Sequence, residues 1–166
     1  MFEQVREFAR PVISGTHARR HGLKLLRGAC LVTLAAIAVQ FGLGMILNLY
    51  VEVPSSDAHA GWLQEIETAP AVLTAHAVLG LLLLGGAAIV AIQAIAMRHA
   101  ALIAVATAGI VVLIGAFAAG EEFVKDGSSG ASLTMALLAS VALLCYATVQ
   151  AIASAKARHL ALTRQS

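Results

Sequence analysis

The sequence predicts an all-α, polytopic membrane protein in which four helices cross the bilayer and pack as an antiparallel bundle. Hydrophobic residues make up 60% of the 166 residues and charged residues only 12%, whereas soluble domains average roughly 45–50% and about 25%. This composition excludes an ordinary soluble enzyme, a disordered chain and a nucleic-acid-binding protein. The apolar residues form long continuous runs rather than an alternating pattern, which excludes a transmembrane β-barrel. Lipid offers no partner to a backbone amide, so each run is expected to be helical.

Four apolar runs are long enough to cross the hydrocarbon core, which takes about 20 helical residues. We predict spans over residues 28–50, 71–97, 99 or 100–119 and 131–154, with no Asp, Glu, Lys or Arg in their interiors. The short connection after residue 97 makes the second and third spans antiparallel neighbours. The predicted organisation is a basic leader (1–27), the transmembrane domain (28–154) and a short tail (155–166).

The leader has its own amphipathic pattern. Phe2, Val5 and Phe8 recur at helical spacing among charged residues. This spacing predicts a short interfacial helix that lies on the membrane and ends near Pro11 and Gly15. The first span follows a long basic leader, is too long for the apolar region of a signal peptide and leads into a loop without an obvious small-x-small cleavage site, so we expect it to be retained.

Basic residues mark one side of the predicted membrane. They flank the start of the first span, the connection after the second and the end of the fourth, whereas one lysine, Lys125, lies on the other side. The positive-inside rule therefore predicts a plasma-membrane protein with both termini in the cytoplasm. The basic side also suits anionic lipid, although topology signalling alone explains the same pattern. The opposite side holds most of the acids: Glu52, Asp57, Glu65, Glu67, Glu121, Glu122 and Asp126.

His76 is the one histidine well inside a predicted span, and an ionisable residue in the membrane marks a functional site by default. The helical rise of about 1.5 Å per residue places it roughly 9 Å below the outer helix end, at a depth similar to that of Met45 and Met135. Haem iron takes His/His or His/Met axial ligands. Gly80, one turn after His76, would let a flat macrocycle approach the backbone. We therefore predict haem b or a transition-metal ion at His76, with Met45 or Met135 as second ligand.

Further metal-ligating candidates lie outside the spans. Asp57 and His59 form a D-x-H pair in the loop after the first span, and such oxygen and nitrogen ligands suit zinc or copper. Glu121 and Glu122 lie at the outer end of the third span. The simpler alternative is a solvated acidic loop for Asp57 and His59, and helix-end carboxylates in headgroup water for Glu121 and Glu122.

Other functions stay open. A neutral His76 can simply hydrogen-bond between helices, or it can gate a proton or small solute with Glu121 or Glu122. Recurrent glycine and alanine residues permit close packing within one bundle or between protomers, so a homo-oligomer, or a non-catalytic accessory or scaffold subunit of a larger membrane complex without a cofactor, is the alternative. The sequence does not decide whether the chain is an enzyme.

Two segments carry a resemblance to known families. Residues 39–44 (VQFGLG) and 48–54 (NLYVEVP), with the His76-x-x-x-Gly80 step, resemble an uncharacterised bacterial family of four-helix integral membrane proteins. The Gln40-x-x-x-Gly44 and His76-x-x-x-Gly80 steps are also distantly similar to half of a heme A synthase, a family built from four-helix bundles with haem-ligating histidines near helix ends. This similarity implies His76 as one haem ligand. The fourth predicted span has no histidine and offers Met135 instead.

Overall fold

The computed structural model describes the backbone of residues 2–50, 71–126 and 128–163, and the side chains of 19–50, 71–125 and 128–163. The described backbone forms four helices, α1 (Phe2–Tyr50), α3 (Ala71–Ala96), α4 (Ala100–Asp126) and α5 (Ser129–Leu162). All four contain segments long and apolar enough to cross a membrane. The predicted four-helix membrane protein is therefore confirmed at this level.

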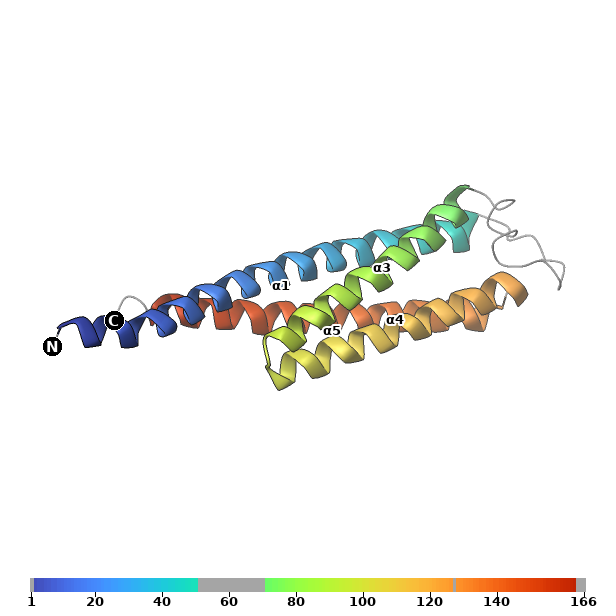
Figure 1. The fold of residues 1–166 in the computed structure, drawn as a ribbon. Helices are drawn as coiled ribbons and strands as arrows, with labels where there is room; N and C mark the ends of the chain where they lie inside the picture. The colour runs from blue at the N-terminus through green and yellow to red at the C-terminus, as the bar shows by residue number, and fades with distance from the viewer. Residues whose placement is uncertain (1, 51–70, 127, 164–166) are drawn as a thin grey trace.

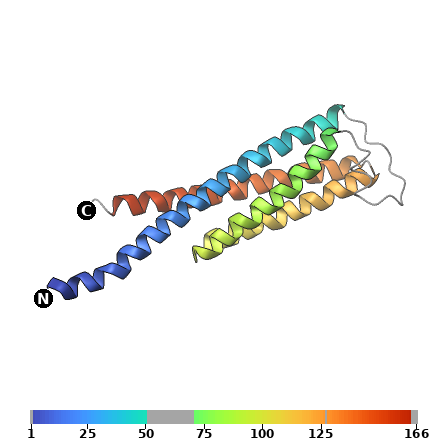
Figure 2. The ribbon, with the colours of Figure 1, turned by 45° about the horizontal axis from the view of Figure 1, so that its top comes forward.

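The helices form a closed ring (Figures 1 and 2). α1 packs against α3 and α5, and α4 packs against the same two helices, with no direct packing between α1 and α4 or between α3 and α5 in the described parts of the chain. Successive helices run in opposite directions, so both chain termini lie at the same end of the bundle (Figure 1). The second and third predicted spans are antiparallel neighbours, as expected from their short connection.

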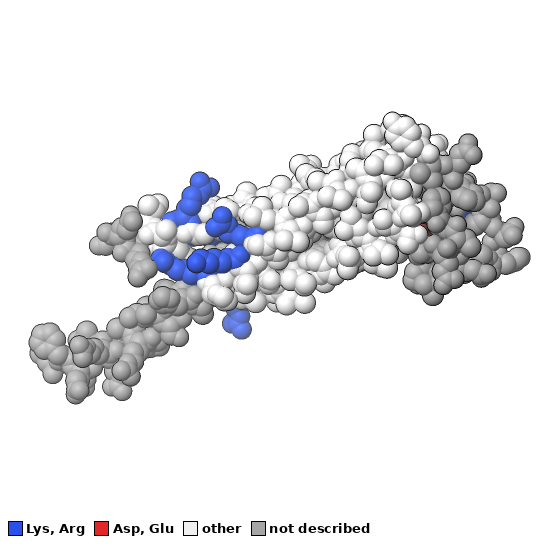
Figure 3. Space-filling model, turned by 90° about the horizontal axis from the view of Figure 1, so that it is seen from above, with Lys and Arg blue, Asp and Glu red and all other residues white. Residues whose placement is uncertain are grey.

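Lysine and arginine gather at the end where the termini lie (Figure 3). We call this the basic end; its described Lys and Arg residues are Arg19, Arg20, Lys24, Arg27, Arg98, Lys156 and Arg158. The other end, where α1 stops at Tyr50 and α3 begins at Ala71, is called the distal end. Between the two ends the surface is apolar, with many large aliphatic side chains exposed, as a lipid-facing surface requires.

The turns at the two ends have different chemistry. At the basic end, Arg98 lies between α3 and α4 with φ 50°, a left-handed conformation that side chains other than glycine rarely adopt. Its backbone N–H donates to the Ile95 carbonyl at 2.9 Å, which closes the last turn of α3. At the distal end, Ser128 is the N-cap of α5, and its hydroxyl accepts from the Ala131 N–H at 3.2 Å.

One boundary prediction is wrong. We expected a separate interfacial helix that stops near Pro11 and Gly15, but α1 continues through both residues and across the predicted boundary at residue 27. A proline inside a helix loses its own hydrogen bond and crowds the carbonyl four residues earlier, which costs about 3 kcal/mol, and a glycine costs about 1 kcal/mol relative to alanine. In a helix of 49 residues, these two local penalties do not end the helix.

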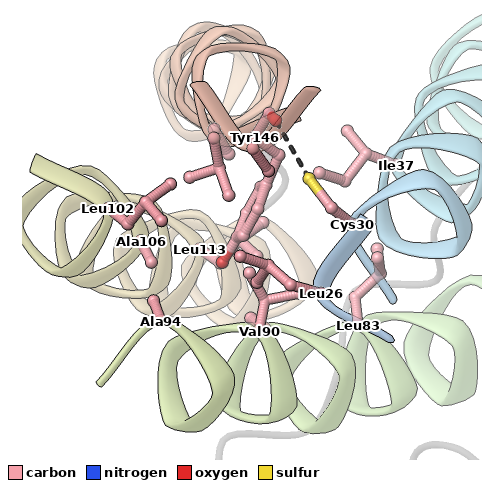
Figure 4. Packing of buried hydrophobic residues seen from close by; sticks show 14 of the residues in the cluster. Leu26, Cys30, Ile37, Leu83, Val90, Ala94, Leu102, Ala106, Leu113 and Tyr146 are labelled. Atoms are coloured by element: carbon pink, nitrogen blue, oxygen red, sulfur yellow. Dashed lines mark hydrogen bonds between the residues drawn. The ribbon is translucent and has the colours of Figure 1, made fainter. Parts of the chain in front are cut away.

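The core is narrow and consists of small and aliphatic residues around one aromatic ring (Figure 4). Tyr146, Leu26, Ile37, Leu102 and Val90 are the largest fully buried side chains. The Cys30 thiol of α1 donates to the Tyr146 carbonyl of α5 at 3.0 Å. A thin core of this kind is expected where lipid covers most of the helix surface.

Candidate functional site

The distal half of the α1–α3 interface contains two reciprocal contacts. His76 of α3 lies against Gly44 of α1, where an added Cβ would be 3.3 Å from the imidazole Cε1. Gln40 of α1 lies against Gly80 of α3, where an added Cβ would be 3.3 Å from Nε2 of the amide. Each helix thus has one large polar residue and, one turn later, a glycine. The polar residue of each helix packs against the glycine of the other helix.

A hydrogen bond joins the two contacts. Gln40 Nε2 donates to the main-chain carbonyl of His76 at 2.9 Å. Two polar atoms of this pair, Nδ1 of His76 and Oε1 of Gln40, are buried without a partner among the described residues. A buried polar atom ordinarily has a hydrogen-bond partner, so the pair has unused capacity for a ligand, a water molecule or a proton.

Gly80 packs against the side chain of Gln40 in this structure. We predicted that it leaves room for a macrocycle, but the Gln40 amide covers it, and Phe117 of α4 lies 3.9 Å from the position of an added Cβ. A flat group that used this face would first have to displace the Gln40 side chain.

The two methionines lie at the same depth as His76. Asn48 of α1 accepts a hydrogen bond from the Ser132 hydroxyl of α5 at 3.2 Å, and this antiparallel register places residue 45 opposite residue 135. Met45 is 48% exposed. Met135 lies against Gly120 of α4, with its sulfur 3.3 Å from the position of an added Cβ.

The predicted metal candidates are not brought together. Glu121 and Glu122 are exposed at the distal end of α4, and the Lys125 ammonium donates to Glu121 at 2.7 Å. Asp57 and His59 lie outside the described residues. Among the residues searched, no group of three or more His, Cys, Asp and Glu side chains is arranged to hold a metal ion.

The predicted site did not include a second polar layer, which lies in the half of the bundle next to the basic end. Four polar atoms there are buried without a partner among the described residues: Arg27 Nε, Gln93 Oε1, Tyr146 OH and Gln150 Oε1. We call these residues the Arg27 layer. In the sequence, this layer is indicated by the glutamines and the tyrosine that lie inside otherwise apolar runs. Gln40 was not among the predicted site residues either, although its Gln-x-x-x-Gly spacing matches the His-x-x-x-Gly spacing of its partner.

A mostly apolar zone separates the two polar layers. The buried side chains of Ile37, Leu83, Ala87 and Leu113 lie in the intervening turns of α1, α3 and α4. Thr33 is also buried there, and its hydroxyl donates to the Ala29 carbonyl of its own helix at 2.9 Å. Residues 27 and 40 of α1 lie in the two layers, and thirteen residues of helix correspond to roughly 20 Å. The interior therefore holds two distinct polar layers rather than one continuous polar route.

Comparison with known proteins identifies no relative, because no protein-family model, curated protein or solved structure matches this chain. The resemblances to a bacterial four-helix family and to half of a heme A synthase stay predictions.

Proposed function

We propose that this chain is an integral membrane protein that binds haem b in the distal half of its bundle, with His76 as an axial ligand. One observation carries the proposal: a buried imidazole nitrogen, Nδ1 of His76, has no partner among the described residues. A nitrogen that is not already hydrogen-bonded within the bundle leaves the imidazole free to reorient toward an iron. Met45 or Met135 is the proposed second ligand, because both lie at the depth of His76.

We favour haem over a bare transition-metal ion because haem needs fewer ligands from the protein. A zinc or copper ion takes about three or four ligands from the protein, and the described residues provide no such cluster. Haem supplies four nitrogens itself and needs one or two axial side chains. When bound, it would supply one-electron redox chemistry; the apolar helix faces around His76 would exclude water from it.

The proposed orientation has both termini in the cytoplasm of a cell whose plasma membrane holds the protein. Support comes from the cations at the basic end (Figure 3) and from the positive-inside rule. The layer that contains His76, Gln40, Met45 and Met135, which we call the His76 layer, then faces outward. Reporter fusions at residue 166 and within the 51–70 segment test this orientation, because a periplasmic reporter should be active only in the 51–70 fusion.

The test of haem binding is a visible spectrum of the purified protein, oxidised and then reduced with dithionite, after expression in cells supplied with a haem precursor. We expect a Soret band and sharpened bands on reduction. His76→Ala should lose these bands, and His21→Ala, which removes an exposed histidine at the basic end, should keep them. A spectrum without haem bands in the parent protein contradicts haem binding, and elemental analysis for zinc and copper then tests the metal ion.

A second candidate is an accessory or scaffold subunit without a cofactor. The reciprocal Gln40–Gly80 and His76–Gly44 contacts favour it, because they use both polar side chains to hold α1 against α3. This candidate predicts a stoichiometric partner after gentle extraction. A lone, monodisperse protein would contradict it. The apolar zone between the layers does not favour the proton or solute pathway.

A further inference from the structure

The Arg27 layer brings polar side chains from three helices to one depth. Contacts of Gly22 with Met97 and of Gly86 with Thr33 fix the register of α1 against α3. Between these two contacts, residue 27 lies opposite residues 92–93, so Gln93 is level with Arg27.

A second pair of contacts gives the same result for α5. The Arg20 guanidinium donates to the Leu160 carbonyl, and Cys30 donates to the Tyr146 carbonyl. Between these contacts, residue 27 lies opposite residues 149–153, which include Gln150. Arg27, Gln93 and Gln150 therefore surround one level of the bundle, and Tyr146 belongs to the adjacent turn.

The Tyr146 hydroxyl reaches the centre of the bundle from α5. The side chain is fully buried, at 0% exposure, and its ring lies against Gly109 of α4, where an added Cβ would be 3.0 Å from Cζ. In Figure 4 the ring points away from α5 toward Leu26, Val90 and Leu113. The hydroxyl nevertheless has no hydrogen-bond partner among the described residues.

Among the described side chains, those around this layer carry positive charge, because the two acids whose side chains are described, Glu121 and Glu122, both lie at the distal end, where Glu121 pairs with Lys125. Arg27 is half-buried, and its Nε atom is buried without a partner among the described residues. A buried atom of a charged group ordinarily has a partner of opposite charge or a hydrogen bond. Arginine is suited to phosphate because its planar guanidinium donates two parallel hydrogen bonds to phosphate oxygens.

We propose that the Arg27 layer is a binding site for a phosphate-type anion, entered from the basic end. The Arg27 guanidinium supplies the charge, and the Tyr146 hydroxyl forms the floor. The unpartnered atoms of Gln93 and Gln150 are the Oε1 acceptors, so each amide turns its NH2 group toward the anion when it donates to the remaining oxygens. The ring of cations from Arg19 to Arg158 attracts the anion to the entrance. The phosphate can come from an anionic phospholipid headgroup or from free phosphate. This site is separate from the His76 layer and does not depend on haem.

The experiment measures the melting temperature of the purified full chain in a neutral detergent at constant ionic strength, with increasing amounts of three probes. These are phosphatidylglycerol, inorganic phosphate, and phosphatidylcholine as a lipid without net charge. Binding to the folded state raises the melting temperature by mass action. A shift with phosphatidylglycerol alone assigns the lipid headgroup, and a shift with inorganic phosphate assigns the free anion. No shift with either anion overturns the proposal.

Variants separate the site from general surface charge. We expect Arg27→Gln to weaken binding roughly tenfold or more, because a charge-assisted hydrogen-bond pair is lost. The matched control is Lys24→Gln, which removes an exposed cation one turn away on α1 and should have a small effect. Equal effects of the two variants would show diffuse attraction and overturn the proposal. If Arg27→Gln does not fold, Tyr146→Phe takes its place, since it keeps the ring packing; unchanged binding in that variant also overturns the proposal.

Discussion

The imidazole of His76 on α3 lies against the backbone of α1 at Gly44, where a Cβ would be 3.3 Å from Cε1. The Gln40 amide makes the matching contact with Gly80 in the opposite direction and donates to the His76 carbonyl. These contacts fix both the separation and the register of α1 and α3 in the distal half. Substitutions at the glycines should therefore act on the folded bundle directly.

Gly44→Leu should destabilise the protein. A leucine there overfills the contact with His76, and overpacking in a tight interior costs typically about 1–3 kcal/mol. The matched control is Gly42→Leu, because an added Cβ at Gly42 has nothing within 4 Å. Thermal unfolding in detergent checks this, and equal melting temperatures for the two variants would contradict the close contact.

Gly109→Ala should destabilise the core around Tyr146. The new methyl group would be 3.0–3.2 Å from ring atoms and the hydroxyl of a fully buried tyrosine, and we expect a loss of about 1–3 kcal/mol. Gly85→Ala is the control, since nothing lies within 4 Å of its added Cβ. The loss should shrink in a Tyr146→Leu background, where the clashing ring is absent. A loss of the same size in both backgrounds would rule out the ring as its cause.

Gln40→Leu should cost less than Gly44→Leu. It removes the hydrogen bond to the His76 carbonyl, and interhelical hydrogen bonds in membranes average about 0.6 kcal/mol, with a maximum near 1.7. It also removes the unpartnered Oε1 atom, which offsets part of this loss. Urea or SDS unfolding measures the difference, with Val39→Leu on the lipid-exposed surface as control. A loss above about 3 kcal/mol would show that Gln40 has a larger role than this single bond.

Arg98→Gly should stabilise the turn between α3 and α4. Arg98 has φ 50°, and the left-handed region costs an L-residue roughly 1–2 kcal/mol that glycine does not pay. Arg98→Ala is the control, because it removes the same charge but keeps the Cβ. The melting temperature of the glycine variant should exceed that of the alanine variant. The reverse order would show that the side chain stabilises the turn by more than its backbone strain.

Hydropathy predicted the helices and the ends of the first two spans, at residues 50 and 97, well, but it placed the ends of the last two spans too early. The starts at residues 71 and 100 agree with the structure, whereas α4 continues to Asp126 and α5 to Leu162. The reason is physical. The length of an apolar run follows the thickness of the hydrocarbon core, but the hydrogen bonds of a helix form as well in the headgroup region and beyond it. For the same reason the basic leader remains helical in continuity with the first span.

The depth of the candidate site could be predicted, but its contacts could not. Counting residues from the helix ends places His76, Met45 and Met135 in one layer, and the contacts across the helices agree. Which way each side chain points depends on the rotation of each helix about its axis, and small residues on several faces leave that rotation open. In the structure, Met135 packs against Gly120, His76 against Gly44 and Gln40 against Gly80.

The unequal lengths of the helices have a practical consequence. α1 and α5 continue past the turn at Arg98, and the Arg20–Leu160 hydrogen bond joins them there (Figures 1 and 2). The result is a two-helix extension beyond the α3–α4 turn, on a protein of only 17.1 kDa. A soluble fusion partner joined to α5 through an uninterrupted helix would be held in a fixed orientation relative to the bundle. This gives electron cryomicroscopy the mass and asymmetry needed to align particles that are otherwise hidden in a detergent micelle.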